Sequence, residues 1–185
     1  MMMPRCGVPD IVNGRTRMNS AGKYNLDYAF YDGQPKWPLS KKVLNWGLLA
    51  GTRRDIIDPV SNYALLSWTG VTPFKFNFVD ENVRGGDIAI GFVNKSSVLS
   101  EGALGFAFPP TFGTVYFNGN VNWSDGTAAP GTYDMGTAAL HELGHALGLQ
   151  HSSVEAAIMW PTLGSGVIKG LHDDDYQGMK ALYGT

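Results

Sequence analysis

The chain has 185 residues and a mass of 20.0 kDa, with 44% hydrophobic and 16% charged residues, so it can bury one sizeable core but hardly two. Its 14 Lys and Arg residues against 16 Asp and Glu residues give a formal charge of -2, without the basic excess that nucleic-acid binding requires. A single cysteine excludes an intramolecular disulfide framework, and four histidines limit the number of metal sites. No apolar run approaches the roughly 18 residues needed to span a bilayer, and the first residues lack the pattern of a secretory signal.

The first part of the chain predicts an extended lead-in segment followed by a folded domain. Residues 1–36 are rich in Asn, Gly, Arg and Pro and lack sustained periodicity, so we place a boundary near Trp37. Asp58 opens a predicted helix that runs to Trp68, with Pro59 at the first position, where its missing N–H costs nothing. Runs rich in β-branched and aromatic residues predict strands over residues 43–49, 72–79, 87–93, 105–108 and 114–117.

The last third of the chain predicts two helices. Strong helix formers fill residues 133–147, and Gly148 ends that helix. A final helix is expected over residues 173–183. Together these elements indicate a small α+β domain whose sheet comes mostly before its helices.

The most informative stretch is residues 141–151, which reads HELGHALGLQH. On a helix, His141 and His145 project from the same face and can present two imidazole nitrogens to one ion. His151 lies six residues further, about 600° around a continued helix, so it can join them only if the helix stops and the chain turns back. Gly148 supplies that stop, because glycine adopts the left-handed conformation without a Cβ penalty. Three histidine nitrogens leave one tetrahedral position open, which is typical of a catalytic zinc site.

Glu142 is the predicted general base of this site. It neighbours a ligand but points about 100° around the helix, so it can reach a zinc-bound water without binding the metal. It would accept a proton from that water, whose pKa zinc lowers to about 7, and pass it to the departing amine. A chance origin is the alternative: a His-Glu-His pattern arises by accident in about one chain in several hundred, and the added Gly and third His lower this by roughly a thousandfold.

Residues 141–151, followed by Ala157-Ile158-Met159-Trp160-Pro161, resemble the zinc site and Met-turn of the metzincins. Residues 4–10, which read PRCGVPD, resemble the cysteine-switch segment of the matrix metalloproteinases, or matrixins, and residues 68–76 and 170–184 resemble their framework. The resemblance covers nearly the whole chain and is greatest to plant matrixins without a hemopexin-like domain. It implies a matrixin catalytic domain, with a twisted five-stranded mixed sheet and three helices.

The resemblance also implies a substrate cleft along an exposed edge strand. An extended peptide would pair with that strand through main-chain hydrogen bonds, and Leu104 and Gly105 fall on it by position. The segment 160–166, with Pro161, would line the pocket for the residue after the cleaved bond. Met159 would form an apolar floor under the zinc. Asp174, with its neighbour Asp175, would anchor the Met-turn, although a run of acidic residues is also typical of a helix's first turn.

Cys6 is implied to be an inhibitory zinc ligand. An isolated cysteine is usually a small buried residue, but the Pro, Arg, Gly and Asp residues around it are poor core companions. A thiolate could fill the fourth zinc position and exclude water. The resemblance then divides the chain into residues 1–36, the end of a propeptide with an activation linker, and residues 37–185, the catalytic domain. Arg5 and Asp10 would hold the switch by an ion pair, and cleavage between about Gly14 and Trp37 would free the site.

The chain departs from the matrixins at their second zinc site. In that family a structural zinc is held by histidine and aspartate residues in a loop and in the two strands after it. Here that loop, residues 93–101, has no histidine, and Phe106 and Tyr116 stand at ligand positions. The one remaining histidine, His172, lies at the far end of the chain, so we expect no second zinc.

The chain also departs from the matrixins at their calcium sites, which puts calcium binding in question. Asn118 and Asn120 replace acidic ligands of the family, and carboxylates are the main ligands of calcium in proteins. The predicted cofactor is therefore a single catalytic zinc ion. Aromatic packing by Phe106, Phe108, Tyr116 and Phe117 is our hypothesis for what replaces the lost metals.

The sequence thus predicts a secreted, extracellular zinc metalloendopeptidase, latent until the Cys6 segment is removed, monomeric and acting on extended peptides or proteins. A latency segment that begins at residue 4 indicates a truncated precursor. Two alternatives remain: an inactive or weakened peptide-binding relative that has lost its structural metal sites, and a zinc hydrolase of non-peptide amides. The intact Glu142 favours the peptidase.

Overall fold

The computed structural model describes residues 5–9, 11–12, 15–16, 28–81, 86–94, 99, 102–127 and 129–184. Its centre is a five-stranded sheet in the order β5-β4-β6-β8-β7. The strands are β4 (Val43–Leu48), β5 (Lys75–Glu81), β6 (Ile88–Val93), β7 (Gly105–Ala107) and β8 (Thr114–Asn118). All neighbours run parallel except β7, which pairs antiparallel with β8 and forms one edge of the sheet. The predicted five-stranded mixed sheet is confirmed.

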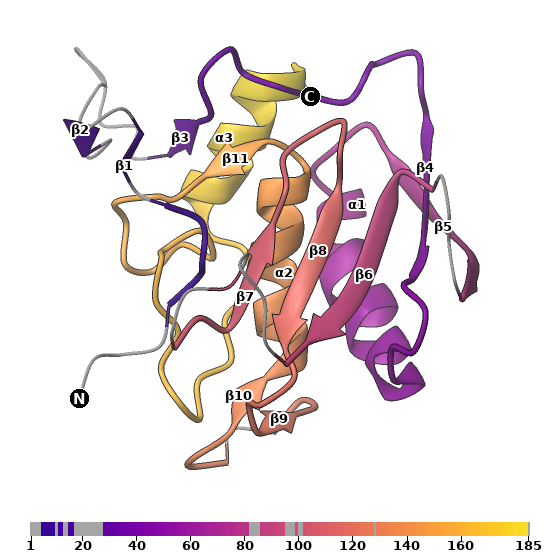
Figure 1. Ribbon diagram of the computed structural model, residues 1–185. Helices are drawn as coiled ribbons and strands as arrows, with labels where there is room; N and C mark the ends of the chain where they lie inside the picture. The colour runs from indigo at the N-terminus through magenta and orange to yellow at the C-terminus, as the bar shows by residue number, and fades with distance from the viewer. Residues whose placement is uncertain are drawn as a thin grey trace.

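Among the described residues, three helices accompany the sheet, as predicted, and Figure 1 shows where they lie. The first is continuous over residues 57–69 and contains η2 (Pro59–Leu65), with π-type hydrogen bonds, and α1 (Leu66–Thr69); a short 3₁₀ turn, η1 (Arg54–Ile56), precedes it. The second is α2 (Met135–Ala146), which contacts the first helix and strands β7 and β8, and the third is α3 (Asp173–Tyr183). Figure 1 places α2 and the first helix behind the same face of the sheet.

Two of the helices differ from their prediction, the first in its hydrogen-bond pattern and the second in its starting residue. Hydroxyl groups of Ser61, Ser67 and Thr69 each donate to the carbonyl four residues earlier, so they compete with backbone N–H donors inside the first helix. The second helix starts at residue 135 rather than 133, because Asp134 caps it: its side chain accepts hydrogen bonds from the backbone N–H and the hydroxyl of Thr137.

The hydrophobic core lies between the sheet and the helices. Two buried tryptophans fix helix positions in it: Trp68 Nε1 donates to the carbonyl of Leu140 at 2.9 Å, and Trp37 Nε1 donates to the carbonyl of Ala146 at 2.9 Å. The backbone N–H of Trp37 also donates to the Tyr183 hydroxyl. Trp37, where the sequence predicted the domain to start, therefore joins the ends of α2 and α3.

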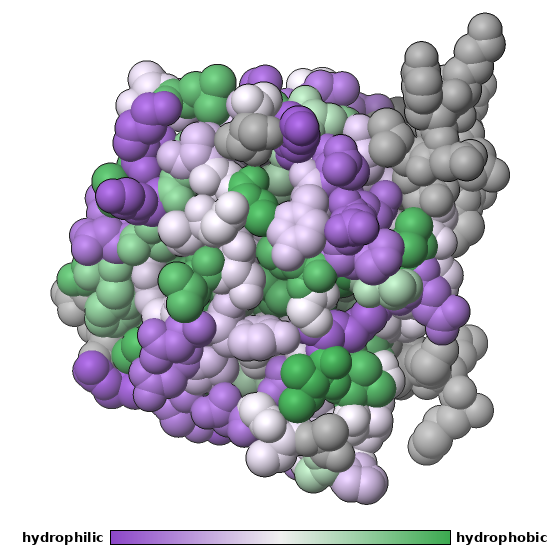
Figure 2. Space-filling model, turned by 180° about the vertical axis from the view of Figure 1, so that it is seen from behind, coloured by the Kyte–Doolittle hydropathy of each residue, from purple (hydrophilic) through white to green (hydrophobic). Residues whose placement is uncertain are grey.

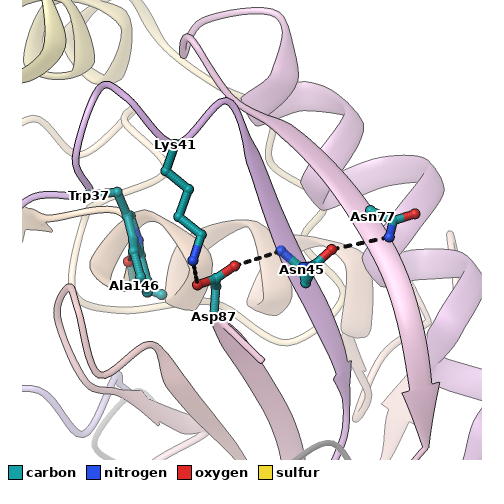
Figure 3. A network of polar contacts seen from close by, with 6 residues as sticks. All are labelled: Trp37, Lys41, Asn45, Asn77, Asp87 and Ala146. Carbon is teal, nitrogen blue, oxygen red and sulfur yellow. Dashed lines mark hydrogen bonds and ion pairs between the residues drawn. The ribbon is translucent and has the colours of Figure 1, made fainter. Parts of the chain in front are cut away.

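A polar network ties the start of β6 to its neighbours (Figure 3). Asp87 accepts a hydrogen bond from the backbone N–H of Asn45 at 2.9 Å and pairs with Lys41. Asn45 in turn accepts a hydrogen bond from Asn77 on β5 at 3.1 Å. Because the three strands run parallel and are not joined by tight turns, these side-chain bonds help to set their register.

Short strand pairs and bridges lie outside the main sheet or extend it, and the sequence predicted none of them. Strand β3 (Ala29–Phe30) pairs antiparallel with β11 (Leu149–Gln150), and β9 (Trp123–Ser124) pairs with β10 (Tyr133–Asp134). Strands β1 (Ile11–Val12) and β2 (Arg15–Thr16) pair with each other. Arg5 forms isolated bridges with Ala103 and Thr162.

The surface carries apolar side chains in small groups. In Figure 2, green residues alternate with purple and white ones over the visible face. Small groups of this kind are usual on protein surfaces and need no ligand to explain them. Among the described residues, no helix is both long and apolar enough to cross a bilayer.

Candidate metal centre

Three histidines and one cysteine meet at one end of α2. His141 and His145 lie on that helix, His151 follows β11, and Cys6 comes from the N-terminal segment. One ligand atom of each lies within 4.8 Å of the others, and in the part of the chain that the structure describes this is the one such group of His, Cys, Asp or Glu. Zinc–nitrogen distances of about 2.0–2.1 Å and a zinc–sulfur distance of about 2.3 Å make this donor set suitable for one tetrahedral zinc ion.

Backbone carbonyls orient two of these rings. The Nδ1 atoms of His141 and His145 lie 2.6 Å from the carbonyl of Ile158 and 2.8 Å from that of Leu149. Because a carbonyl only accepts hydrogen bonds, each Nδ1 carries the proton and each Nε2 keeps its lone pair. The Nε2 of His145 is buried and has no hydrogen-bond partner among the described residues. Burial, with the neighbouring His151 and His141, lowers the pKa of His145 well below its ordinary value and favours the neutral ligand form.

The turn that brings in His151 begins directly after α2. Gly148 has a φ of 109°, and its N–H bonds to the carbonyl of His145. A Cβ on Gly148 would lie 2.7 Å from the carbonyl oxygen of Pro35 and 2.8 Å from Leu182, so both its conformation and its surroundings require glycine. The chain then forms β11, which pairs with β3, and reaches His151.

Cys6 is buried at the centre of the site, with 5% of its surface exposed. Its sulfur accepts a hydrogen bond from the N–H of Val8 at 3.3 Å and lies 3.5 Å from Oε2 of Glu142. The Arg5–Asp10 ion pair that the sequence suggested involves Asp10, which lies outside the described residues.

Glu142 is buried, with 2% of its surface exposed, and burial raises its pKa to about 8 while the contact with Cys6 opposes this shift. Its carboxyl can therefore hold the proton that lies between Oε2 and the sulfur. Strand β7 packs against it closely: a Cβ on Gly105 would lie 2.8 Å from Oε1. Glu142, the base predicted from the sequence, thus projects from α2 and packs against the edge strand β7.

The Cys6 segment occupies the cleft through backbone hydrogen bonds. The N–H of Leu104 donates to the carbonyl of Arg5 at 3.0 Å, and the N–H of Gly7 donates to the carbonyl of Gly105 at 2.7 Å. On the opposite wall, the N–H of Cys6 donates to the carbonyl of Pro161 at 2.9 Å. All three residues predicted to bind substrate, Leu104, Gly105 and Pro161, therefore face this segment.

A pocket opens beside Cys6, His141 and Glu142. Its remaining walls come from the residue before β7, from α2, and from the segment between Ile158 and Lys169: Leu104, Thr137, Ala138, Ile158, Trp160, Pro161, Thr162, Leu163 and Lys169. Part of the predicted pocket segment 160–166 is therefore present in the wall.

Met159 and two acidic residues of α3 contact the segments that carry the histidines. Met159 is buried, and a Cβ on Gly144, between the two helical histidines, would lie 2.3 Å from its sulfur. Asp175 accepts hydrogen bonds from the N–H groups of Ile158 and Met159 at 2.9 and 3.2 Å. Asp174 accepts one from the hydroxyl of Ser152 at 2.7 Å.

The positions expected to have lost metal ligands carry other contacts. Phe106 and Tyr116 lie directly opposite each other on β7 and β8. Phe106 stacks edge to face with Phe108, with ring centroids 5.0 Å apart. The Asn118 side chain donates a hydrogen bond to the carbonyl of Ala103 and accepts one from the N–H of Asn120. These hydrogen bonds connect the residues before β7 with the turn after β8.

Two residues near the site escaped the sequence analysis. Tyr31 follows β3, its ring meets that of His145 edge-on with centroids 6.1 Å apart, and its buried hydroxyl has no hydrogen-bond partner among the described residues. Burial, with Cys6 and Glu142 nearby, raises its pKa. Lys169 lines the pocket although no motif includes it. Both approach the site only through tertiary folding, so a local sequence signal could not identify them.

Comparison with known proteins agrees with this geometry. The family model described as Matrixin matches residues 36–184. Metalloendoproteinase 5-MMP of Arabidopsis thaliana is 35% identical over 202 residues, which cover 100% of this chain and 56% of that protein. Metalloendoproteinase 1 of Glycine max is 34% identical, covering 100% of this chain and 64% of that protein. Matrilysin of Homo sapiens is 32% identical, covering 100% and 67%.

The chain therefore spans between about half and two thirds of the length of these curated relatives. The family match covers the sheet, the histidine cluster and all three helices. On these grounds the chain belongs to the matrixin family.

Proposed function

We propose that this chain is the latent form of a secreted zinc metalloendopeptidase that hydrolyses peptide bonds in extracellular proteins. One observation carries the proposal: three imidazoles, a buried carboxyl and a thiol from a distant segment converge at one end of α2. A purely structural zinc site does not need a carboxyl that lies beside the zinc ligands without binding the metal itself. The family membership and the names of the relatives support the same reading.

Zinc is the cofactor that these residues fit, held by His141, His145 and His151. When bound, it supplies Lewis-acid polarisation of the substrate carbonyl and lowers the pKa of a water molecule. Glu142 accepts a proton from the attacking water and passes it to the departing amine nitrogen. In the latent form the Cys6 segment covers Glu142, and this burial raises the pKa of the carboxyl; removal of the segment would expose the carboxyl for both steps.

Latency comes from residues 1–36, which we assign to the end of a propeptide and an activation linker; residues 37–185 are the catalytic domain. The sulfur of Cys6 is the fourth zinc ligand in the latent form, and the hydrogen bond from Val8 supports a sulfur that carries negative charge. Removal of this segment frees the backbone groups of Leu104, Gly105 and Pro161 for a substrate. An extended peptide would then add to the edge of β7.

We further propose that the active chain is a monomer with a single zinc ion and no bound calcium. Support comes from the aromatic residues at Phe106 and Tyr116 and from the amide contacts of Asn118 and Asn120. Aromatic stacking and amide hydrogen bonds would then hold the strands and loops that metal ions hold in other matrixins.

The test uses the full chain with zinc added, in the forms Cys6→Ser and Cys6→Ser with Glu142→Ala. Both are offered an unfolded protein substrate, and zinc content and fragment formation are measured. The proposal expects one zinc per chain in both forms and cleavage only where Glu142 is intact. Equal cleavage by both forms, or none by either after residues 1–36 have also been removed, would favour the peptide-binding relative instead, and more than one tightly held zinc would contradict the single-metal assignment.

A further inference from the structure

The pocket beside the metal centre extends away from it along α2. His141 and Thr137 both line it, and they lie one helical turn apart on the same face, a separation of about 6 Å along the helix axis. The backbone N–H of Lys169 donates to the Thr137 hydroxyl at 3.1 Å. The backbone of Lys169 therefore lies beside Thr137, one turn of α2 away from His141.

Most of the pocket wall is apolar, and its hydroxyl groups are already engaged. Thr137 donates to Asp134 at 2.7 Å, and Thr162 accepts a hydrogen bond from Trp160 Nε1 at 2.9 Å. Ala138 adds only a methyl group to the wall.

Lys169 is the one lysine or arginine among the residues that line the pocket. Its Nζ donates to the carbonyls of Glu155 at 2.6 Å and of Ala157 at 2.7 Å. An ammonium group has three protons, so these two bonds leave one N–H for another acceptor. The two carbonyls also fix the position of the nitrogen, which reduces the entropy lost when a ligand binds to it.

This inference rests on the proposed function. We propose that Lys169 determines specificity at the residue that follows the cleaved bond, and that the pocket selects a long side chain ending in a carbonyl or carboxylate oxygen, glutamine or glutamate. The pocket opens at Glu142 and Pro161, where a peptide on the cleft would place that residue. A lysine or arginine at the same position meets a like charge.

The experiment compares four peptides that differ only at the residue after the cleaved bond: leucine, glutamine, glutamate or lysine. The enzyme is the full chain carrying Cys6→Ser, alone and with Lys169→Met, which keeps the stem and removes the charge. We expect kcat/KM for the glutamine and glutamate peptides to exceed that for the leucine and lysine peptides. In the Lys169→Met form, the ratio of kcat/KM for the glutamine peptide to kcat/KM for the leucine peptide should fall about tenfold, as expected for the loss of a hydrogen bond to a charged group. Lys169→Arg, which keeps the charge, retains the ranking.

Binding provides a second measurement that does not depend on catalysis. The same peptides are titrated into the Cys6→Ser, Glu142→Ala form, with and without Lys169→Met, and their Kd values are compared. Cleavage of no peptide, together with the expected ranking of Kd values, would contradict the proposed function and support the role of Lys169. A leucine preference in the form that retains Lys169, or a glutamine-to-leucine ratio that Lys169→Met leaves unchanged in both measurements, would overturn the inference.

Discussion

The sulfur of Cys6 lies 3.5 Å from Oε2 of Glu142, so the inhibitor and the base of the proposed reaction share one hydrogen bond. The contact has two consequences. It keeps water from the carboxyl, and it places a proton where either group can hold it. In the proposed latent form, the N-terminal segment thus blocks both the fourth zinc position and the group that would activate water there.

The first prediction concerns latency. Cys6→Ser in the uncleaved chain should raise peptide cleavage by at least about tenfold, because a neutral hydroxyl is a far weaker zinc ligand than a thiolate. The measurement is the initial rate of peptide cleavage, with mass spectrometry of the enzyme to show that residues 1–36 remain attached. Equal rates for the two uncleaved forms would rule out inhibition by Cys6.

The second prediction concerns the contact between Gly144 and Met159. Gly144→Ala would place a Cβ 2.3 Å from the methionine sulfur and 3.1 Å from Trp68, and overpacking of this kind costs about 1–3 kcal/mol of unfolding free energy. Gly70→Ala is the matched control, because its Cβ would meet nothing closer than 3.5 Å and its φ is -69°. Chemical denaturation should show a loss for Gly144→Ala and almost none for Gly70→Ala. Similar values for both would show that the methionine moves at little cost.

The third prediction concerns Asp175. This buried carboxylate accepts hydrogen bonds from the N–H groups of Ile158, Met159 and His172. Asp175→Asn leaves one oxygen and turns an amide N–H₂ toward backbone donors, so we expect a loss of about 2–4 kcal/mol in unfolding free energy. Thermal unfolding measures it, and Asp173→Asn is the control because that side chain is exposed. A Tm for Asp175→Asn within a degree of that of the control would contradict the proposed anchoring of the Met-turn.

The fourth prediction concerns alkaline pH. The Tyr183 hydroxyl donates to the carbonyl of Leu147 at 2.7 Å, and burial raises its pKa to about 12, although the bond from the N–H of Trp37 opposes the shift. Since the folded pKa lies above the ordinary value of about 10, the protonated form stabilises the fold below pH 10, and this contribution is lost as the pH rises from 10 through 12. The full effect of two pKa units is about 2–3 kcal/mol.

The check is the unfolding free energy of the natural chain and of Tyr183→Phe between pH 8 and 12. Other tyrosines titrate in both forms, so the difference between the two curves isolates Tyr183. That difference should shrink as the pH rises through this window. A constant difference would show that Tyr183 does not carry the predicted pH dependence.

The sequence was sufficient for those parts of the molecule that local chemistry determines. The spacing of His141 and His145 on a helix, and the glycine at position 148, follow from helix geometry and backbone sterics, and the structure places the three histidines together. The mixed sheet with β7 at its edge followed from the family resemblance rather than from periodicity. Element ends were less accurate: Thr72 continues the hydrogen bonds of the preceding helix and Pro73 lacks an N–H, so β5 starts at Lys75 rather than at residue 72.

Features that depend on packing between distant segments could not be predicted. Nothing near Lys169 in the sequence indicates that its backbone meets Thr137, 32 residues earlier. Likewise, Tyr31 lies in a stretch without periodicity, and only the pairing of β3 with β11 brings it to His145. The division at residue 36 remains a prediction, because Ala29 and Phe30, ahead of that boundary, already pair with a strand of the folded domain.

Because β3 pairs with β11, the position of the proposed activating cut affects more than the release of Cys6. A cut before Ala29 would discard the thiol and leave the strand that leads into His151 hydrogen-bonded to Ala29 and Phe30. A cut after Phe30 would discard the thiol together with this partner strand. Two processing enzymes that cut only a few residues apart would thus yield mature forms with equally open clefts but unequal restraint on the third zinc ligand.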